Sequence, residues 1–556
     1  MADLHSWRQA DTAAVARNLV NDNFDVLHPR ILSAVSIDGM GRDNKDRYHF
    51  AEFPLYQVFV ATGSFLTGDI VTSGRIVSIV SSLVSVVVLF LLTRRYYSDR
   101  VAFLSAFVFG LLPYNVFWSR TVLPDPMMIM FCLLSLLFFD AWVRDSSKPF
   151  AGDPKLTRNY VLALVFFGCA MLLKAFPLFL LIPMSYLLLK KRSLPWMPLA
   201  LLAIVPVIGW NVYKEIIDVR PMRLWMTPAL LVLGIAELYL IYRFREYLWK
   251  LRDFFVMIFV ALIPLGLWRI WMQQWPMSIP ASSWLFDGKN LRLKPAWWHW
   301  IFQQRLSEYM FNFSGLLFIG LGLLFNKELL RRSELPFQLG SIVQFIKQIF
   351  HIKRTVGKQD IAVYAPWFFP LSFATCLLYF VVFATGNVTH EYYQIVIIPF
   401  GSVLVATGFW YMWDFGEEYW ELVIRRLSAL ALLGITLLLG WYSVRDWYTI
   451  GNPMQITIGA RADLLLPKDA LVIAPYGGDT TFLYYINRSG WSVIDKRLQE
   501  MIDRGATHFV SNYRDDGTNR VARLYTIVEE TQEYVIVDLR QKSNDPEWAT
   551  IGTYEL

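Results

Sequence analysis

Long apolar segments alternate with short polar ones over most of the chain. A helix needs about 17–25 mainly apolar residues to cross a bilayer, and roughly twelve segments come close to that length. This pattern predicts a polytopic α-helical membrane protein. The segments are 74–93, 101–118, 126–143, 159–174, 175–189, 194–213, 223–246, 253–271, 313–326, 364–385, 392–412 and 427–443.

Two stretches do not fit this pattern simply. The stretch 159–189 is long enough for one helix, but Lys174 and Pro177 interrupt its middle. Proline breaks helices and ionisable residues avoid the bilayer core, so we expect a turn there at a membrane face. The stretch 54–69 is too short and interrupted to span, and counting it as a crossing would invert every later loop. We expect it to form an interfacial helix.

Clusters of lysine and arginine set the expected orientation, because cytoplasmic loops are rich in both residues. Six clusters fall in alternate loops, at 94–95, 144–158, 190–192, 243–252, 327–358 and 425–426. With these loops in the cytoplasm, the segments outside are 1–73, 119–125, 272–312, 386–391 and 444–556. The chain then divides into a first extracytoplasmic loop with interfacial helices (1–73), a transmembrane part with one long outer loop (74–443) and an extracytoplasmic domain (444–556).

The first loop needs an explanation of how it reaches the outside. It carries neither a signal peptide nor a spanning helix. We expect a hydrophobic anchor ahead of Met1 that this sequence does not include. The alternative is that insertion of the later helices draws the amino end across the membrane.

After residue 443 the pattern becomes that of a small α/β domain. The runs 470–476, 507–511 and 534–539 are typical of strands, and 496–504 is typical of a helix. Gly477-Gly478-Asp479 follows the first predicted strand. Such a glycine pair binds phosphate at some helix starts, but we favour a tight turn.

Composition supports the membrane interpretation and excludes other classes. Of 556 residues, 55% are hydrophobic and 17% charged, whereas a soluble domain has about a quarter charged residues. The net charge of +7 comes from loop clusters, so we expect no nucleic-acid partner. Cys132, Cys169 and Cys376 lie in apolar runs without paired spacing, which indicates neither a disulfide framework nor a zinc site.

Three carboxylates lie in the segments that are expected on the extracytoplasmic side of the membrane. Asp11 follows Trp7-Arg8-Gln9, Glu52 precedes Pro54, and Asp125 lies in a short loop between two predicted spans. Asp11 and Asp125 suit helix N-caps, and Glu52 suits a helix amino end. A carboxylate at the membrane surface also suits a base that takes a proton from a hydroxyl or amine. We favour one composite site over three separate caps.

Cationic and polar side chains at the same face are candidate substrate contacts. Lys174 lies within apolar sequence, where an ionisable group marks a functional site by default, although snorkelling explains it equally well. The other candidates are Arg8, Arg75, Arg120, Arg269, His390, Glu391 and Tyr392. A metal site built on His390 and Glu391 is not favoured, because adjacent residues point apart. We therefore expect no metal and no cofactor.

Four short motifs together resemble a known group of membrane glycosyltransferases. They are Trp7-Arg8-Gln9-Ala10-Asp11, Glu52-Phe53-Pro54-Leu55-Tyr56, Leu123-Pro124-Asp125 and His390-Glu391-Tyr392-Tyr393. The chain is similar over most of its length to bacterial transferases of the family 39 type. These are related to protein O-mannosyltransferases and to the aminoarabinose transferase of lipid A, and their shared architecture is called GT-C.

This resemblance implies a polyprenyl-phosphate-sugar donor used on the extracytoplasmic face of the plasma membrane. In that group the acid of the first outer loop is the catalytic carboxylate, a position that Asp11 matches, and Asp125 matches the acid of the second outer loop. Glu52 matches the charged position ahead of the proline motif. Here that motif has a single proline, Pro54, after Phe53, where relatives often have two prolines after Lys or His.

The expected reaction follows from these assignments. Asp11 deprotonates the acceptor, which attacks the anomeric carbon with inversion, while Lys174, Arg75 or Arg269 stabilises the departing phosphate. The expected partners are the lipid-linked donor, membrane lipids and a lipid, glycan or protein acceptor. Two alternatives remain: a lipid or sugar transporter or flippase, for which neither internal repeats nor several mid-helix charges are evident, and a non-catalytic envelope-assembly protein.

Overall fold

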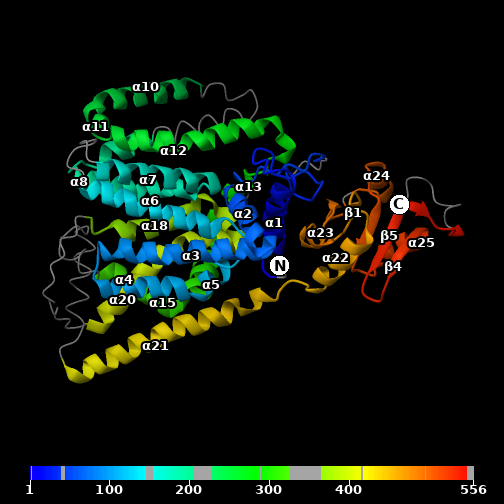
Figure 1. Ribbon diagram of the computed structural model, residues 1–556. Coiled ribbons are helices and arrows are strands. Elements are labelled where there is room, and N and C mark those ends of the chain that lie inside the picture. The colour runs from blue at the N-terminus through cyan, green and yellow to red at the C-terminus, as the bar shows by residue number, and fades with distance from the viewer. Residues whose placement is uncertain are drawn as a thin grey trace.

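The computed structural model describes residues 1, 3–38, 44–145, 154–204, 227–287, 290–325, 365–414, 418–494 and 496–546. It consists of a large helical part and a smaller domain with a five-stranded sheet (Figure 1). The first helix, α1 (Ser6–Asn21), lies where the two meet (Figure 1).

The helical part contains most of the elements of the chain. Its long helices lie side by side in Figure 1, with α21 along one edge. The elements are α2 (Leu55–Thr67), α3 (Ile70–Arg94), α4 (Asp99–Leu111), α5 (Pro113–Trp118), α6 (Asp125–Asp145), α7 (Pro154–Leu173), η1 (Phe176–Leu180), α8 (Leu181–Lys191), α10 (Thr227–Arg243), α11 (Arg245–Lys250), α12 (Arg252–Trp271), α13 (Trp284–Asp287), α14 (Pro295–His299), the π-helix η6 (Trp300–Phe311), α15 (Asn312–Phe325), α18 (Phe368–Val382), α19 (Ala384–Thr389), η7 (Glu391–Ile397), α20 (Ile398–Asp414) and α21 (Tyr419–Val444).

Side-chain caps and prolines explain several helix ends. The Asp69 carboxylate accepts a hydrogen bond from the Thr72 N–H at 2.7 Å, which caps α3. The predicted segment 101–118 is two helices, because Pro113 begins α5 and cannot continue α4. The stretch 159–189 is also divided as expected: α7 ends at Leu173 and α8 begins at Leu181.

Within the described ranges, six helices are long and apolar enough to cross a membrane. They support an integral membrane protein, whereas the predicted number of about twelve spans is not established. Parts of the predicted segments 194–213 and 223–246, residues 326 and 364, and the predicted cytoplasmic cluster 327–358 lie outside the described residues. The six spans are Ile70–Arg94, Asp125–Asp145, Arg252–Gln274, Pro295–Phe325, Glu391–Asp414 and Tyr419–Tyr448.

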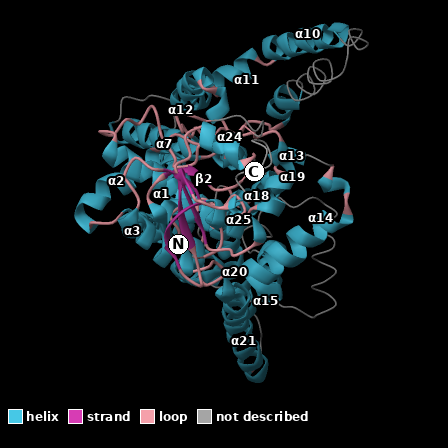
Figure 2. Ribbon diagram, turned by 90° about the vertical axis from the view of Figure 1, so that its right-hand side faces the viewer, coloured by secondary structure: helices cyan, strands magenta, loops and turns pink. Residues whose placement is uncertain are grey.

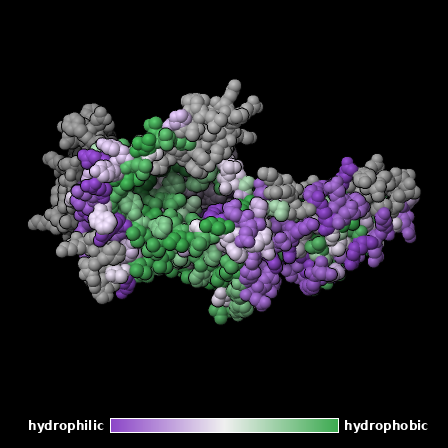
Figure 3. All heavy atoms as spheres, turned by 90° about the horizontal axis from the view of Figure 1, so that it is seen from above, coloured by the Kyte–Doolittle hydropathy of each residue, from purple (hydrophilic) through white to green (hydrophobic). Residues whose placement is uncertain are grey.

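The surface separates into apolar and polar regions. Figure 3 shows hydrophobic residues over the middle of the helical part, with hydrophilic residues at its far end and over the smaller domain. Exposed apolar side chains include Phe259 and Leu267 on α12 and Leu438 on α21. Apolar side chains exposed over long helices are typical of a lipid-facing surface.

The smaller domain is a mixed sheet with short helices. Its elements are α22 (Met454–Leu465), β1 (Leu471–Ile473), α23 (Thr481–Ile486), β2 (Ser489–Trp491), α24 (Leu498–Asp503), β3 (His508–Ser511), α25 (Asp516–Leu524), β4 (Tyr525–Glu530) and β5 (Val535–Lys542). The strand order is β2-β1-β3-β5-β4, with β1 parallel to β2 and β3, and β5 antiparallel to β3 and β4. The three predicted strands are β1, β3 and β5, and the predicted helix 496–504 is α24. Strands β2 and β4 were not predicted.

The first loop is part of the same folded unit as this domain. The Ala34 N–H donates to the Gly490 carbonyl at 2.7 Å, and the Gly490 N–H donates to the Leu32 carbonyl at 3.0 Å, so residues 32–34 extend the sheet beside β2. Gly490 is required here, since a Cβ would lie 1.9 Å from the Val472 carbonyl oxygen. Figure 2 looks onto this domain and shows its strands beside α1.

Helix α1 packs directly on α23. The Arg17 guanidinium lies 3.8 Å from the ring centre of Tyr484 and donates to the Tyr484 carbonyl at 3.1 Å and to the Asn487 side chain at 2.8 Å. Cation–π contact and hydrogen bonds together join the first loop to the smaller domain.

Candidate functional site

Asp11 lies in the second turn of α1, where the helix meets the smaller domain. It is not the helix N-cap that the sequence suggested, because α1 begins at Ser6 and His5 occupies the cap in a left-handed conformation without a capping side chain. The Asp11 carboxylate is 7% exposed and accepts a hydrogen bond from the Thr480 hydroxyl at 2.7 Å. The capping interpretation therefore fails, and Asp11 remains available for chemistry.

The environment of Asp11 suits a general base. Burial raises the pKa of Asp11 to about 6, even though the Thr480 hydrogen bond and the Arg8 charge act in the opposite direction. Asp479 and Glu52 add to the rise. A carboxyl with a pKa just below neutrality is largely ionised at pH 7 yet basic enough to accept a proton.

Arg8 forms an ion pair with Glu52, and its charge also acts on Asp11. Its guanidinium donates to the Glu52 carboxylate at 2.5 Å and lies 3.2 Å from the His49 ring nitrogen. Burial alone would raise the pKa of Glu52, but Arg8 and Lys174 hold it below its ordinary value. Burial and the Arg8 charge lower the pKa of His49 to about 4, which keeps that ring neutral. Helix α2 has no side-chain cap hydrogen bond, and the Glu52 carboxylate is paired with Arg8 instead.

Lys174 forms a second ion pair of the site, with Asp125. It follows the last residue of α7, and its ammonium donates to the Asp125 carboxylate at 2.7 Å. The ammonium also lies 4.7 Å and 4.8 Å from the ring centres of Tyr392 and Tyr393. Lys174 is therefore held in a buried ion pair against two aromatic rings, not simply extended into solvent.

The segment from His390 to Tyr393 forms another wall of the site. The His390 ring stacks on Tyr392 at 5.2 Å and lies 5.5 Å from His5. Burial is the main cause that lowers the pKa of His390 to about 3. The Glu391 carboxylate accepts a hydrogen bond from His5 at 2.5 Å and pairs with Arg305 at 2.8 Å.

Ion pairs, ring contacts and charge–charge interactions link one group of side chains. We call it the charge cluster: Arg8, Asp11, Glu52, Asp125, Lys174 and Glu391, with Tyr392 and His390 beside them. The structure thus brings together eight of the eleven predicted site residues. They come from the first loop, from the ends of α6 and α7 and from η7, segments far apart in the sequence.

Arg75, Arg120 and Arg269 lie outside the charge cluster. Arg120 and Arg75 pair with the buried Asp3 at 3.1 Å and 3.8 Å. Arg120 also lies 4.3 Å from the ring centre of Tyr448. Arg269, near the end of α12, donates to the Met272 sulfur at 4.0 Å. The predicted substrate role of these three arginines has no support from their contacts within the described residues.

Sequence reasoning missed Thr480, Arg305 and His5 as members of the site. Thr480 follows the glycine turn, whose Gly477 and Gly478 have φ values of 59° and 86°, so the tight turn favoured from the sequence is present. Its position two residues after Gly478 was the available signal. Arg305 lies in the long predicted outer loop among polar neighbours, Gln304 and Glu308, so the apolar context that identified Lys174 is missing there.

A metal site is not evident in the described part of the chain. No group of three or more His, Cys, Asp or Glu residues there is arranged to hold an ion. His390 and Glu391, the pair considered from the sequence, face an aromatic group and Arg305 respectively. Independence from metals remains a prediction.

Part of the chain matches a known protein family, and the fold matches solved structures. Residues 52–212 match the family described as dolichyl-phosphate-mannose-protein mannosyltransferase. A search against curated proteins finds no match. The fold is similar to ArnT from Cupriavidus metallidurans, with a TM-score of 0.50 and 12% identity over 95% of this chain and 93% of that one. It is also similar to the Archaeoglobus fulgidus oligosaccharyltransferase, with a TM-score of 0.50 and 11% identity over 91% of this chain and 65% of that one.

The fold is therefore the one that ArnT and this oligosaccharyltransferase share, the GT-C architecture that the sequence motifs predicted. The family match over residues 52–212 covers Glu52, Asp125 and Lys174, and together with the fold it indicates a glycosyltransferase. The resemblance to this group, stated above from four short motifs, is confirmed.

Proposed function

We propose that the chain transfers a sugar from a polyprenyl-phosphate donor to an acceptor on the extracytoplasmic face of the plasma membrane, with inversion and without a metal ion. One observation carries this proposal. A buried carboxylate, Asp11, whose pKa is about 6, lies beside the Arg8–Glu52 and Lys174–Asp125 ion pairs at the junction of an apolar helical part and a polar domain.

The donor class is supported by the comparisons and by the charge cluster. The matched family is described by a dolichyl-phosphate-linked sugar. The oligosaccharyltransferase AglB from Archaeoglobus fulgidus, with a TM-score of 0.50 and 10% identity, has been solved with a dolichol-phosphate. A polyprenyl tail belongs in lipid, and its phosphate belongs at the headgroup level where cations concentrate. Lys174 and Arg8 are the cations paired with Asp125 and Glu52 in the cluster.

In the proposed transfer reaction, Asp11, the two cations and their two paired carboxylates have different roles. The acceptor oxygen or nitrogen gives its proton to Asp11 and attacks the anomeric carbon of the donor. The bond between that carbon and the phosphate oxygen breaks, and its electron pair leaves with polyprenyl phosphate. Lys174 and Arg8 stabilise the negative charge that develops on the phosphate. Glu52 and Asp125 hold these two cations in place through their ion pairs.

The closing experiment tests Asp11 directly. Membrane vesicles containing the protein receive a panel of labelled polyprenyl-phosphate hexoses and pentoses, and mass spectrometry follows the labelled products. Because a general base contributes about 10²–10⁴-fold to rate, we expect Asp11→Asn to lower transfer at least about a hundredfold. Asp22→Asn is the matched control, since Asp22 ends α1 and pairs with Arg30 away from the cluster.

The outcomes separate the candidate functions. Loss of transfer with unchanged membrane insertion and donor binding supports the enzyme. Unimpaired transfer by Asp11→Asn contradicts the proposal, and transport of the donor without transfer by the wild type indicates a flippase. Transfer by the wild type is expected to persist in excess EDTA; its loss and recovery with a divalent cation would refute the metal-independent mechanism.

A further inference from the structure

A small pocket lies where the first loop meets the smaller domain, and we call it the junction pocket. Its volume is about 200 Å³, which is below the roughly 300–1,000 Å³ typical of sites for drug-sized ligands. Three segments line it: residues 1–7 of the first loop, the chain between α21 and α22 with the start of α22, and the loop after β1. The size suits a ligand with a single small ring.

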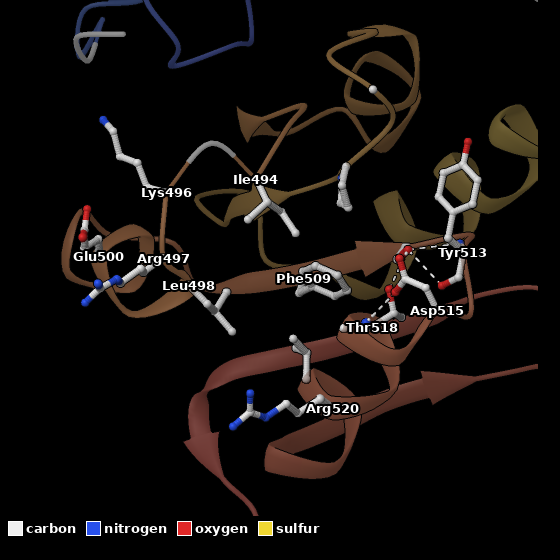
Figure 4. Close-up of a pocket in the computed structure, with 15 residues that line it drawn as sticks. Ile494, Lys496, Arg497, Leu498, Glu500, Phe509, Tyr513, Asp515, Thr518 and Arg520 are labelled. Atoms are coloured by element: carbon white, nitrogen blue, oxygen red, sulfur yellow. Dashed lines mark hydrogen bonds between the residues drawn. The ribbon is translucent and has the colours of Figure 1, made fainter. Parts of the chain in front are cut away.

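The smaller domain also contains a larger cavity, of about 860 Å³, which is lined in part by Tyr513 (Figure 4). Its three cationic side chains, Lys496, Arg497 and Arg520, already have interaction partners. None of the described residues that line this cavity belongs to the first loop. Of the two, only the junction pocket adjoins α1.

The junction pocket lies one helical turn from Asp11. Trp7 lines the pocket, and Trp7 and Asp11 share one face of α1, because residues four apart on a helix are neighbours. The Thr480 hydroxyl lies 2.7 Å from the Asp11 carboxylate and 3.2 Å from the Trp7 carbonyl, so it contacts both residues. Asp479, which also lines the pocket, acts on Asp11 through its charge. A ligand held against Trp7 is therefore close to Asp11.

The basic groups of the junction pocket do not favour an anionic ligand. Among the described residues that line it, none is a lysine or an arginine. The two other basic groups of the lining already have partners: the Met1 amino group donates to the Tyr485 hydroxyl, and the His5 ring is bonded to Glu391. An uncharged ligand is therefore the better match.

Gln455 and Asp479 supply groups that suit hydroxyls. Gln455 is 2% exposed and lines the pocket, and its side-chain nitrogen has no hydrogen-bond partner among the described residues. A buried donor without a partner is costly, and the oxygen of a bound hydroxyl would satisfy it. The Asp479 carboxylate accepts from the Ser6 hydroxyl at 2.9 Å and from the Thr481 N–H at 2.7 Å. Because a carboxylate has about four acceptor positions, Asp479 can also accept from a hydroxyl of the ligand.

Trp7 gives the junction pocket an aromatic wall. The residue is partly exposed, and its ring lies 6.4 Å from His5 and 6.0 Å from His390, between ring centres. Tyr476 is a further aromatic residue in the lining. Aromatic rings next to hydrogen-bonding groups match a ligand that has an apolar face and a polar edge, which is the character of a sugar ring.

We propose that the junction pocket binds one neutral sugar ring, which stacks on Trp7 and forms hydrogen bonds with Gln455 and Asp479. The inference rests on the proposed transfer reaction only for its consequence, which is that the bound ring lies beside the general base Asp11. A neutral ring of this kind can belong to a sugar acceptor or to the donor, and the two sources are separated by competition.

Binding is measured by saturation-transfer NMR and calorimetry on the full-length protein in nanodiscs. The probes are methyl glucoside, methyl mannoside and methyl galactoside, with methyl glucuronide as the anionic comparison. We expect at least one neutral glycoside to bind about tenfold or more tightly than the glucuronide, since Asp479 repels a carboxylate. Trp7→Ala should weaken this binding about tenfold, and Gln455→Leu about fivefold. Leucine removes the unpartnered amide, so the thermal stability of Gln455→Leu should not fall, which a merely structural role would not explain.

Trp420→Ala is the matched control, because Trp420 is 72% exposed on α21 and outside the pocket lining. With a polyprenyl-phosphate sugar added, competition with the glycoside assigns the pocket to the donor ring, and simultaneous binding assigns it to the acceptor. Absence of binding by the wild type, preference for the glucuronide, equal losses in Trp7→Ala and Trp420→Ala, or unchanged affinity in Gln455→Leu would overturn the proposal. Asp11→Asn should bind the glycosides normally, so a failure of the transfer reaction and a failure of this pocket give different results.

Discussion

At the residue scale, the proposed role of Asp11 as general base makes a prediction about the pH dependence of transfer. Burial raises its pKa to about 6, and a general base works only when ionised. The ionised fraction grows as the pH rises through that value. We therefore expect kcat/KM for transfer to increase with pH, with a midpoint near 6 and a plateau above neutrality, measured with purified protein across pH 5–9. A flat profile would contradict a base with this pKa.

Thr480 gives a way to move that midpoint. Its hydroxyl donates to the ionised Asp11 carboxylate, which favours the charged form. Thr480→Val removes the bond, so the pKa of Asp11 should rise by up to about one unit, the equivalent of about 1.4 kcal/mol. Transfer below pH 6 should fall about tenfold, whereas the rate near pH 8.5 changes little. The charges facing Asp11, those of Arg8, Asp479 and Glu52, remain unchanged.

Thr480→Ser is the control for this measurement. It keeps the hydroxyl and loses only a methyl group, so the midpoint should return to that of the wild type. A variant that lowers transfer equally at every pH would instead indicate a packing defect at the junction of α1 and α23.

The residue types of the site were largely predictable from the sequence, but their partners were not. Asp11, Glu52 and Asp125 were identified as carboxylates in segments expected on one face of the membrane, and Lys174 was identified as a charge within apolar sequence. Which cation meets which carboxylate depends on how four distant segments pack. Arg75 shows this limit, since its position at an outer helix end placed it with the substrate, whereas in the structure it pairs with Asp3.

At the element scale, the break between α7 and η1 places Lys174 against Asp125. Lys174→Gln keeps a hydrogen-bond donor but removes the charge that stabilises the departing phosphate. We expect the donor KM to rise or kcat to fall about tenfold or more, with a smaller loss of stability than in Lys174→Met, because glutamine can still donate a hydrogen bond to Asp125. Lys174→Met leaves the Asp125 carboxylate buried without its partner and should lower the free energy of unfolding by about 3–5 kcal/mol.

Lys191→Gln provides the comparison for these two variants. Lys191 ends α8, the helix that follows the same break, and its exposed ammonium donates to the Arg144 carbonyl at 3.0 Å. Kinetics and thermal unfolding in detergent should both match the wild type. If Lys174→Gln transfers sugar at the wild-type rate, the phosphate contact must come from another cation.

Element prediction succeeded where hydrophobic runs were long and failed where they were short. Helices α3, α6 and α12 match their predicted segments closely, because a spanning helix leaves a strong apolar signal. Strand β2 has three residues and contains Gly490, a combination that resembles a turn. It forms a strand because β1 and the first loop both pair with it, and local sequence does not contain that information.

At the scale of the whole molecule, the first loop and the smaller domain must lie on one side of the membrane. Residues 32–34 extend the sheet beside β2, and α1 packs on α23. The sequence had placed both segments outside through one count of alternating loops, in which the whole transmembrane part separates 1–73 from 444–556. Their direct contact makes the two placements depend on each other, so a single measurement of sidedness tests both.

That measurement uses single cysteines and a membrane-impermeant maleimide on intact cells. In a background where Cys132, Cys169 and Cys376 are replaced, Asp25→Cys and Leu464→Cys mark the first loop and α22, whereas Asp99→Cys marks the start of α4 near the arginine cluster. All three native side chains are at least 45% exposed, so accessibility to the reagent is set by the membrane. We expect the first two cysteines to be labelled and Asp99→Cys to be labelled only after permeabilisation. Asp11 lies in the first loop and Thr480 lies in the smaller domain, to which α22 belongs. Labelling of Asp99→Cys alone on intact cells would therefore place the charge cluster on the cytoplasmic face and refute an extracytoplasmic reaction.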